Sequence, residues 1–428
     1  MWRKYAAAKE QGGAYAKKGM ETEMEKQVKL TFWNYVDFCD YKPEMLRDWK
    51  ECGMTHPVTP LFDTQKDDCG AFLKMLDDAE DMGLKMILQI GDVFLGRYRR
   101  GEAEYRRTCE DIHARFGSHP AACGYYVGEE PDSGSNDEYF GGAKILKEIA
   151  GDMPVYCNMG SVERTERMLL KGEKTLQEWM RDFVSHTGVD VLGYGTYSQL
   201  LPGGVGIDEH FYNIREFMKG AKDTGVEIWS SLLSSAHYKY RIPTEYDFQW
   251  QINTAVACGC KAIVWFRMYD KLVAPDLWGS PIDEFGEKTQ RYYDLARVQK
   301  RFNVHHGEIM GRLIHKESYG VGIAYGGYHY FIPGASDLVE RAVCPNGMIN
   351  FYVDEDGTDY AVIVNTSQTE ACTFALGLSE KVSEAGIVRF NGKNYNKLCG
   401  RDGKGGLIST GEIWLAPGQM EIIKLTRA

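Results

Sequence analysis

Apolar runs and amphipathic segments alternate along most of the chain. The run 28–33 has the composition of a buried strand, and the segment 43–52 that follows repeats its apolar side chains at helical spacing. The same pair of signals recurs eight times before residue 314. The predicted strands are 28–33, 54–62, 85–90, 124–130, 154–158, 190–194, 226–233 and 261–266. The predicted helices are 43–52, 71–82, 103–116, 139–150, 175–186, 208–224, 244–258 and 289–303.

Strictly alternating strands and helices imply parallel strands joined by right-handed crossovers. Eight such units between residues 28 and 313 are typical of a closed (β/α)₈ barrel, or TIM barrel, which we take as the fold of this α/β region. The alternative is a doubly wound open sheet. It is disfavoured because no Gly-x-Gly-x-x-Gly motif follows an early strand.

The two ends of the chain differ from the barrel. Residues 1–27 are charged and rich in Ala, Lys and Glu, which predicts a polar helical extension. Helical periodicity disappears near residue 314, and short alternating segments separated by turn signals follow. We therefore expect an all-β accessory domain over 314–428, folded as a sandwich. Its predicted strands are 320–324, 328–332, 347–353, 359–364, 372–376, 386–390, 412–415 and 420–425.

Charge and composition exclude several partners. The formal net charge is −11, and an acidic chain is a poor ligand for the phosphates of nucleic acids. We found no apolar run of membrane-spanning length and no apolar signal segment at the amino terminus. The 11 cysteines are odd in number and scattered, several within apolar runs, so we expect reduced, packed thiols and a cytoplasmic protein. The oligomeric state is not predicted.

Polar and aromatic side chains cluster at the carboxyl ends of the predicted strands. In a barrel the loops after the strands form one pit, so these residues should lie together. The candidates are Trp33, Asn34, Asp63, Asp92, Glu129, Glu130, Asn158, Tyr197, His237, Trp265, Arg267, Asp270 and Trp278. Carboxylates and amides bind sugar hydroxyls, and aromatic rings stack on sugar faces. The pit is therefore predicted to bind a carbohydrate, with Trp265 either a stacking platform or a barrel-filling residue.

We expect no metal and no other cofactor. Glycine-rich loops that could hold a phosphate are missing after the last two predicted strands, and His237 is the only histidine near a strand end. One alternative stays open. Asp63 and Asp92 could contribute to a Mg²⁺ site built from carboxylates alone, because Mg²⁺ prefers oxygen ligands.

The stretch Gly124–Pro131 ends its strand in two adjacent glutamates. Paired carboxyl groups cleave glycosidic bonds, and one of them must be protonated near neutral pH. Burial beside tyrosine rings and a second carboxylate both raise the pKa of a carboxyl group. Side chains alternate between the two faces of a strand, so Glu129 is expected to face outward if Glu130 faces the pit.

The sequence Gly128-Glu-Glu-Pro131 resembles the Asn-Glu-Pro motif of clan A glycoside hydrolases, and it is closer to the Asp-Glu-Pro of uncharacterised gut-bacterial members that resemble β-galactosidases and cellulases. The stretches 241–266, 281–303 and 416–425 are also similar to those members. The resemblance implies that Glu130 is the acid/base. Glu129 then occupies the position of the family's Asn.

The chain departs from this family at strand seven, where retaining members carry a nucleophilic glutamate. Here the strand ends Trp229-Ser-Ser-Leu-Leu-Ser-Ser235, and Glu227 comes too early. The second carboxylate is therefore open between Asp63, Asp92, Glu129 and Asp270. An inverting mechanism would separate the carboxyl groups by ~6.5–9.5 Å, against ~5 Å for retention. We expect hydrolysis of a small glycoside with Glu130 as proton donor and Glu129 and Asp270 as further catalytic candidates, or sugar binding without cleavage.

Overall fold

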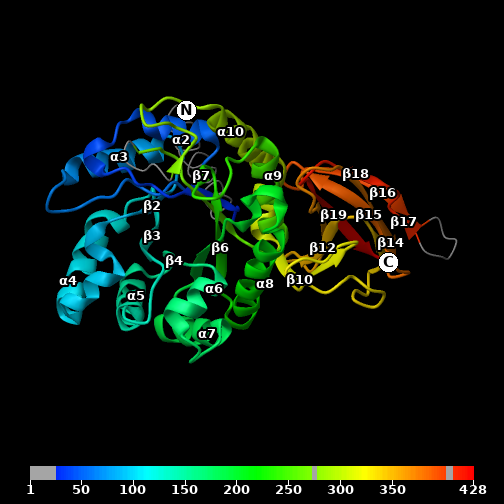
Figure 1. The fold of residues 1–428 in the computed structure, drawn as a ribbon, viewed down its shortest axis with the longest axis horizontal. Coiled ribbons are helices and arrows are strands. Elements are labelled where there is room, and N and C mark those ends of the chain that lie inside the picture. Colours follow the sequence, from blue (N-terminus) through cyan, green and yellow to red (C-terminus); the bar gives the residue numbers. More distant parts are fainter. Residues whose placement is uncertain (1–25, 272–276, 402–407) are drawn as a thin grey trace, which may run out of the picture.

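The computed structural model describes residues 26–271, 277–401 and 408–428, so the predicted amino-terminal extension lies outside the described residues apart from its last two positions. A parallel sheet forms the centre of the first domain (Figure 1). Its strand order is β1-β8-β6-β5-β4-β3-β2. The strands are β1 (Lys29–Phe32), β2 (Met86–Leu88), β3 (Ala122–Glu129), β4 (Val155–Met159), β5 (Val191–Gly195), β6 (Glu227–Leu233) and β8 (Ala262–Phe266).

The segment 55–62 closes this sheet between β1 and β2. Val58 and Phe62 form parallel bridges to Ile87 and Ile90, and Leu61 bridges Asp37 on the other side. The predicted (β/α)₈ barrel is thereby confirmed. The prediction of a regular strand over 54–62 is wrong, however, because this segment makes only isolated bridges. Its two prolines, at positions 57 and 60, have no N–H to donate to a ladder.

Helices surround the sheet on its outer face (Figure 1). Each of the eight predicted helices is present. They are α2 (Glu44–Cys52), α3 (Cys69–Asp81), α4 (Glu102–Ile112), α5 (Asn136–Ala150), α7 (Leu176–Thr187), α8 (Ile207–Thr224), α9 (Glu245–Ala257) and α10 (Gln290–Phe302). Shorter helical pieces were not predicted: α6 (Val162–Thr165), α11 (Glu308–Arg312), η1 (Phe38–Asp40), η2 (Gly91–Val93), η3 (Leu95–Arg100), η5 (Glu166–Leu170), η6 (Ser198–Leu200), η7 (Pro202–Gly204) and η8 (Asn303–Gly307). Another short piece, η4 (His113–Gly117), continues α4 and lies at the end of the predicted helix 103–116. None of the described helices is long and apolar enough to cross a membrane.

Large side chains fill the barrel interior. They form one cluster that is separate from the layer between sheet and helices. Its buried members are Trp33, Val58, Ile87, Tyr126, Tyr156, Val191, Trp229, Ala262 and Val264. These residues mark the inward face of each strand, so any side chain that continues this face past the end of its strand enters the pit.

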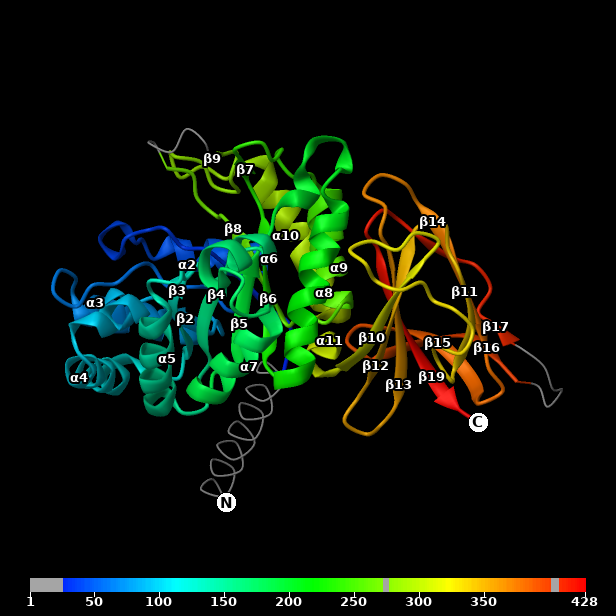
Figure 2. The same ribbon diagram turned by 60° about the horizontal axis from the view of Figure 1, so that its bottom comes forward.

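Two antiparallel sheets form the second domain (Figure 2). The order is β10-β12-β13-β19-β15-β16 in one, and β11-β14-β17 in the other, with β18 added to β14. The strands are β10 (Ile314–Val321), β11 (Val339–Val343), β12 (Gly347–Val353), β13 (Asp359–Asn365), β14 (Cys372–Leu378), β15 (Val382–Arg389), β16 (Asn394–Gly400), β17 (Ile408–Ser409), β18 (Ile413–Leu415) and β19 (Met420–Arg427). One core of buried residues from both sheets lies between them, as in a sandwich.

The start of this domain differs from the prediction. Strand β10 begins at Ile314, and 328–332 is a loop and not a strand. The reason is the turn at Gly326 and Gly327, both at positive φ, which brings this loop onto α8. There the Gly326 N–H donates to an oxygen of Asp208 at 2.8 Å.

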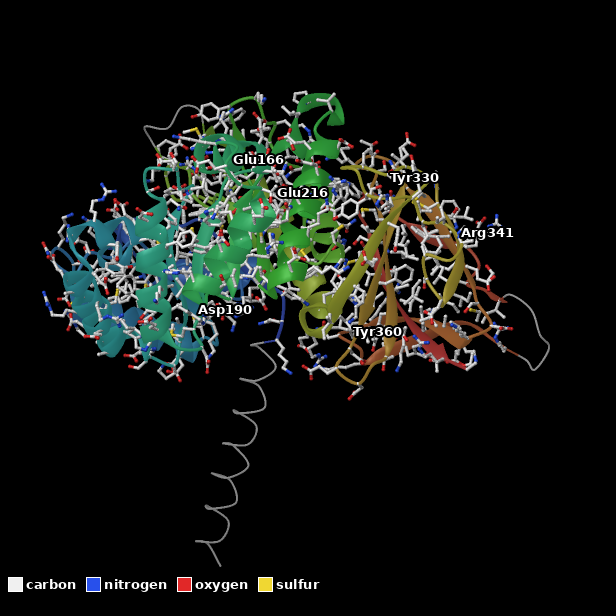
Figure 3. The ribbon with its side chains drawn as sticks, turned by 90° about the horizontal axis from the view of Figure 1, so that it is seen from below. Glu166, Asp190, Glu216, Tyr330, Arg341 and Tyr360 are labelled. Carbon is white, nitrogen blue, oxygen red and sulfur yellow. The ribbon has the colours of Figure 1, made fainter. Side chains whose placement is uncertain are left out.

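Helix α9 joins the two domains. Trp250 Nε1 donates to the carbonyl of Thr366 at 2.8 Å, and Asn253 Nδ2 donates to the carbonyl of Gly418 at 2.8 Å. From the other side, the Tyr352 hydroxyl donates to carbonyls at the end of α9. Nearly every α9 residue is buried, which is typical of a helix covered on all sides. Figure 3, with Glu216 on α8 and Tyr330 and Tyr360 labelled, shows side chains filling the space between the domains.

Candidate functional site

A bulge near the end of β3 decides which glutamate faces the pit. Tyr126 pairs with Tyr156 on β4, but the register then shifts, and Glu129 pairs with Asn158. Gly128 lies in the bulge at φ +145°, a conformation that favours glycine. Residues in register on neighbouring parallel strands share a face, so Glu129 continues the inward face of Tyr126. The expectation that Glu129 faces outward is therefore wrong, because alternation fails at the bulge.

The Glu129 charge acts on the hydroxyls of five tyrosines. They are Tyr35, Tyr126, Tyr139, Tyr156 and Tyr197. Burial, and to a lesser degree the Glu129 charge, raises the pKa of each of these hydroxyls. Burial also raises the pKa of Glu129 itself, the Glu130 charge adds to this, and Arg164 opposes it. Glu129 is nevertheless exposed to solvent. Protein atoms pack around its carboxyl, and water still reaches it through the open mouth of the pit.

Glu130 has a different environment. Its backbone is at φ +45°, and its N–H donates to the carbonyl of Asn158 at 2.6 Å. Its Oε2 forms an ion pair with Arg164 Nη2 at 2.7 Å. The ion pair engages an oxygen that a proton donor would present to its substrate. The two glutamates thus differ in position and in partners: Glu129 continues the inward face of β3, and Glu130 pairs with Arg164.

A chain of hydrogen bonds crosses the barrel beneath Glu129. Trp33 Nε1 donates to Ser231 Oγ at 3.3 Å, and Ser231 Oγ donates to Asn158 Oδ1 at 3.2 Å. The Tyr156 hydroxyl donates to the same oxygen at 3.1 Å. With Oδ1 occupied, the amide nitrogen of Asn158 is left for a ligand. It faces Gly195, whose hydrogen in place of a Cβ keeps this space open between Asn158 and Tyr197.

Aromatic rings line the opposite side of the mouth. The Phe266 ring centre lies 5.9 Å from that of Tyr35, 5.4 Å from that of Tyr197 and 5.3 Å from that of His237. A two-stranded antiparallel ladder of β7 (Ala236–His237) and β9 (Leu277–Trp278) brings His237 and the exposed Trp278 together. Tyr35 and Phe266 were not among the predicted binding residues, although Phe266 ends a predicted strand and Tyr35 lies two residues after another.

Several predicted site residues have local structural partners. Buried Asn34 donates to the Val58 carbonyl, and Trp33 is also buried, packing edge-on against Tyr126. Trp265 points into the helix layer, where its Nε1 donates to Gln299 on α10 at 2.9 Å. The prediction that Trp265 contacts substrate is therefore wrong, because alternation along β8 turns it away from the inward-facing Val264.

The remaining carboxylates are also occupied. Asp63 accepts the N–H of Gln65 and pairs with Lys66, while Asp92 accepts both the N–H and the hydroxyl of Thr64. Asp270 accepts the N–H and the hydroxyl of Ser280, and Arg267 Nη2 lies 3.6 Å from it. Among the described residues, no group of three or more His, Cys, Asp or Glu side chains is placed to hold a metal ion.

The seventh predicted strand, β6, has no carboxylate on its inward face at the carboxyl end, where the pit lies. Its inward residues are Trp229 and Ser231. Glu227 lies at the opposite end of the strand, where it pairs with Lys29 and accepts Trp229 Nε1. The expectation that Glu227 is too early in the strand to reach the pit therefore agrees with the geometry.

No family model and no curated protein matches this sequence. Solved structures with a similar fold include a glycoside hydrolase family 5 protein from Bacteroides vulgatus ATCC 8482, with a TM-score of 0.56 and 10% identity over 93% of this chain and 89% of that one. A structure described as a glycoside hydrolase gives 0.54 and 11%, over 94% and 92%. A β-galactosidase from Marinomonas ef1 matches over 64% of this chain, at 11% identity and a TM-score of 0.45, and the chain spans 60% of that protein.

The chain thus has the fold of a glycoside hydrolase: a (β/α)₈ barrel followed by an antiparallel β domain. At this level of identity the likeness concerns the fold alone, and the site has to be interpreted from its own residues.

Proposed function

We propose that the pit binds a glycoside and that Glu129, not Glu130, donates a proton to the leaving oxygen. The observation that carries this proposal is the β3 bulge, which aligns Glu129 with Asn158 on the inward face. Burial raises the pKa of Glu129, so a larger fraction of this carboxyl keeps its proton as the pH approaches neutrality. The rings of Tyr35, Tyr197 and Phe266 offer apolar faces to a sugar.

In the proposed reaction the glycosidic C–O bond breaks as Glu129 protonates the departing oxygen. Water supplies the oxygen that replaces it at the anomeric carbon, and the proton that this water loses returns to the Glu129 carboxylate. The Asn158 amide nitrogen binds a hydroxyl of the sugar beside Tyr197. His237 and Trp278, on the paired strands β7 and β9, contact the part of the substrate that extends out of the pit. Arg267 and Asp270 hold the β9 side of this pair through the Leu277 carbonyl and Ser280.

A second candidate function is sugar binding without cleavage. The specific observation that favours it is Ser231 on β6, together with the local partners of Asp63, Asp92 and Asp270. A hydrolase needs a carboxylate to form the glycosyl-enzyme or to activate water. In the binding protein the Glu129 carboxyl would bind a hydroxyl group.

Measurement of turnover on glycosides distinguishes the two proposed functions. A panel of aryl glycosides and oligosaccharides is incubated with the wild-type protein, Glu129→Gln and Glu130→Gln, and product is followed by NMR, which also gives its anomeric form. The proposal expects turnover by the wild type and a loss of about 10²–10⁴-fold in Glu129→Gln, with a smaller loss in Glu130→Gln. The reverse order of the two variants would return the role to Glu130. Saturable binding of a sugar with no turnover would establish the second function.

A further inference from the structure

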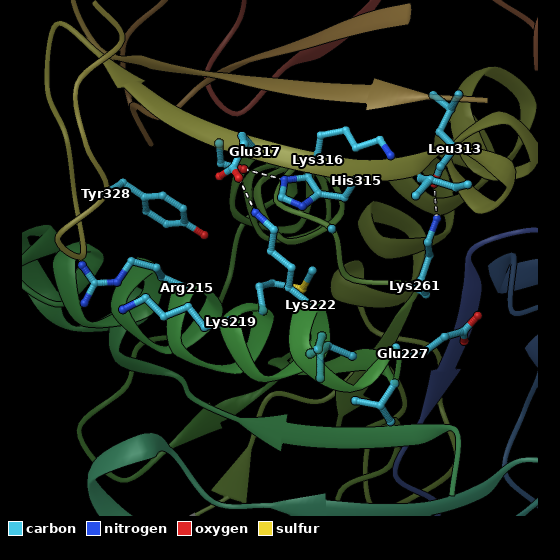
Figure 4. A pocket seen from close by; sticks show the side chains of 18 of the residues that line it. Arg215, Lys219, Lys222, Glu227, Lys261, Leu313, His315, Lys316, Glu317 and Tyr328 are labelled. Carbon is cyan, nitrogen blue, oxygen red and sulfur yellow. Dashed lines mark hydrogen bonds and ion pairs between the residues drawn. The ribbon is translucent and has the colours of Figure 1, made fainter. Parts of the chain in front are cut away.

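A large cavity lies between the two domains, at the ends of the barrel strands opposite to the pit. It measures about 840 Å³ and is lined by α8, the starts of β6 and β8, the end of α11, β10 and the loop 327–329 (Figure 4). Val226, Glu227 and Lys261 belong to the amino-terminal ends of barrel strands, whereas the pit is at the carboxyl ends. A ligand here would contact both domains and would leave the glycoside pit free.

Positive charge dominates the lining of this interdomain cavity. Its cationic side chains are Arg215, Lys219, Lys222, Lys261, Arg312 and Lys316. Its two carboxylates are already engaged, Glu227 with Lys29 and Glu317 with Lys222. Glu216 on α8, next to the cavity, pairs with both Arg215 and Lys219. This excess of cations occurs in a chain whose formal net charge is −11, so it is a local reversal of the overall electrostatics.

Three of these cations have no ion pair within the described parts of the chain. Lys261 is hydrogen-bonded to backbone carbonyls, Arg312 is the last residue of α11, and exposed Lys316 lies on β10. A surface built only for stability would place carboxylates opposite them, because unpaired like charges at short range repel. Cations of both domains, such as Lys219 on α8 and Lys316 on β10, line this one cavity, and a bound anion would explain the arrangement.

The floor of the interdomain cavity is rigidly organised. Lys261 Nζ donates to the carbonyls of Met310, Gly311 and Leu313 at 2.9, 3.1 and 2.6 Å. The His315 ring is hydrogen-bonded to Ser318 Oγ at 2.8 Å, and the Tyr328 hydroxyl points into the cavity (Figure 4). The cavity therefore combines hydrogen-bonded polar groups with several long cationic side chains, an arrangement suited to a ligand with several anionic oxygens.

We propose that this interdomain cavity is a binding site for a small molecule with several negative charges, carried by phosphate groups or by several carboxylates. The volume lies within the range of small-molecule sites, about 300–1,000 Å³. A concave site between two domains fits a compact ligand and not a long rigid polyanion. Because Lys316 belongs to the second domain and Lys219 to the barrel, such a ligand joins the domains and stabilises their interface.

The test is thermal unfolding of the full chain with tripolyphosphate, citrate or inorganic phosphate, each at constant ionic strength set with KCl. The proposal expects a saturable rise in Tm with tripolyphosphate or citrate. In the variant Lys219→Gln/Lys316→Gln the affinity falls at least about tenfold. The control variant Lys66→Gln/Lys74→Gln loses the same charge from exposed lysines of the barrel and keeps the wild-type response.

Each outcome of this test either supports or overturns the proposed binding site. Tripolyphosphate without citrate assigns phosphate as the recognised group, and citrate without tripolyphosphate assigns carboxylate. No shift with either ligand, or an equal loss in both variants, overturns the proposal. Tighter binding of duplex DNA that depends on Lys219 and Lys316 would also overturn it, since the surface would then be a polyanion site.

Discussion

Glu129 is in register with Asn158, and Glu130 is not; the Glu130 N–H instead donates to the Asn158 carbonyl beyond the end of the ladder. A single inserted residue in β3 produces this arrangement. It turns one glutamate of an adjacent pair into the pit and leaves the other at the rim with Arg164. The two carboxyl groups are therefore expected to respond differently to the same substitution.

The pH dependence of the Glu129 carboxyl should follow its neighbours. A proton donor loses activity as the pH rises through its pKa. The Glu130 charge raises the pKa of Glu129 and Arg164 lowers it, so Glu130→Gln should move the alkaline limb of the pH–rate profile to lower pH and Arg164→Gln to higher pH. Each shift should be up to about one pH unit. Titration of ¹³C-labelled carboxyl groups by NMR measures the same shifts without turnover, and shifts in the opposite directions would contradict the assignment.

Glu129 should also influence stability. Its pKa is raised in the folded state, so the folded protein binds more protons than the unfolded chain, and stability falls as the pH rises from the unfolded pKa of about 4.5 through the folded value. Glu129→Gln removes this dependence. We expect a higher Tm than wild type at pH 7 and a smaller difference at pH 4. An unchanged difference between the two pH values would contradict the raised pKa.

The bulge should not tolerate a side chain at Gly128. Its φ of +145° is unfavourable for other residues, and an added Cβ would lie 2.8 Å from the Tyr139 hydroxyl. Gly128→Ala should lower the free energy of unfolding by about 1–3 kcal/mol, measured by urea denaturation. Gly134→Ala in the following loop, where the nearest atom is 3.5 Å away, is the matched control. Equal losses in the free energy of unfolding for the two variants would show that a Cβ at position 128 does not strain the bulge.

The contact between the domains can be tested at Trp250. Trp250→Phe removes the hydrogen bond to the Thr366 carbonyl and leaves a buried acceptor without this donor. The expected loss is about 1–3 kcal/mol in the free energy of unfolding. Tyr246→Phe, on the exposed side of the same helix, should change it by less than about 0.5 kcal/mol. Urea denaturation followed by fluorescence and circular dichroism measures both.

Two buried thiols of the second domain lie within reach of each other. Cys344 Sγ and Cys372 Sγ are 3.5 Å apart. Thiol–disulfide exchange with a small disulfide such as oxidised glutathione should link them. One thiolate attacks the reagent and releases the first reduced glutathione. The second thiolate then attacks the resulting mixed disulfide, forms the Cys344–Cys372 disulfide and releases the second reduced glutathione. Peptide mapping should show a linked pair about 2 Da lighter than the two thiols. Cys344→Ser should abolish it, and continued alkylation of both cysteines after exposure to the reagent would contradict the prediction.

Much of the fold follows from periodicity, because buried strands and amphipathic helices alternate with clear spacing. All eight barrel helices were predicted for this reason, with the Thr244–Asp247 capping box at the start of α9. Segment 54–62 was less regular than predicted, since Pro57 and Pro60 interrupt the ladder. The 328–332 region looked like a strand because Tyr, Phe and Ile are strand formers, whereas its position is set by contacts with α8.

The site was harder to predict than the fold. Strand ends identified Glu129, Asn158, Tyr197 and His237 as pit candidates, but the choice between Glu129 and Glu130 depends on register with β4. Register comes from pairing between strands and is not encoded by the spacing within one of them. Trp265 shows the same limit, since its aromatic character suits both a sugar platform and the helix layer that it occupies.

The segment that closes the barrel has a further consequence for how the molecule opens. Between β1 and β2 the ring of strands is completed by the isolated bridges of Val58, Leu61 and Phe62, whereas every other junction is a ladder between two strands. Amide protons of Thr59 and Phe62 should therefore exchange with solvent before those of β4, β5 and β6. We expect the barrel to open first at this junction, before the strands that carry Glu129 and Asn158 separate.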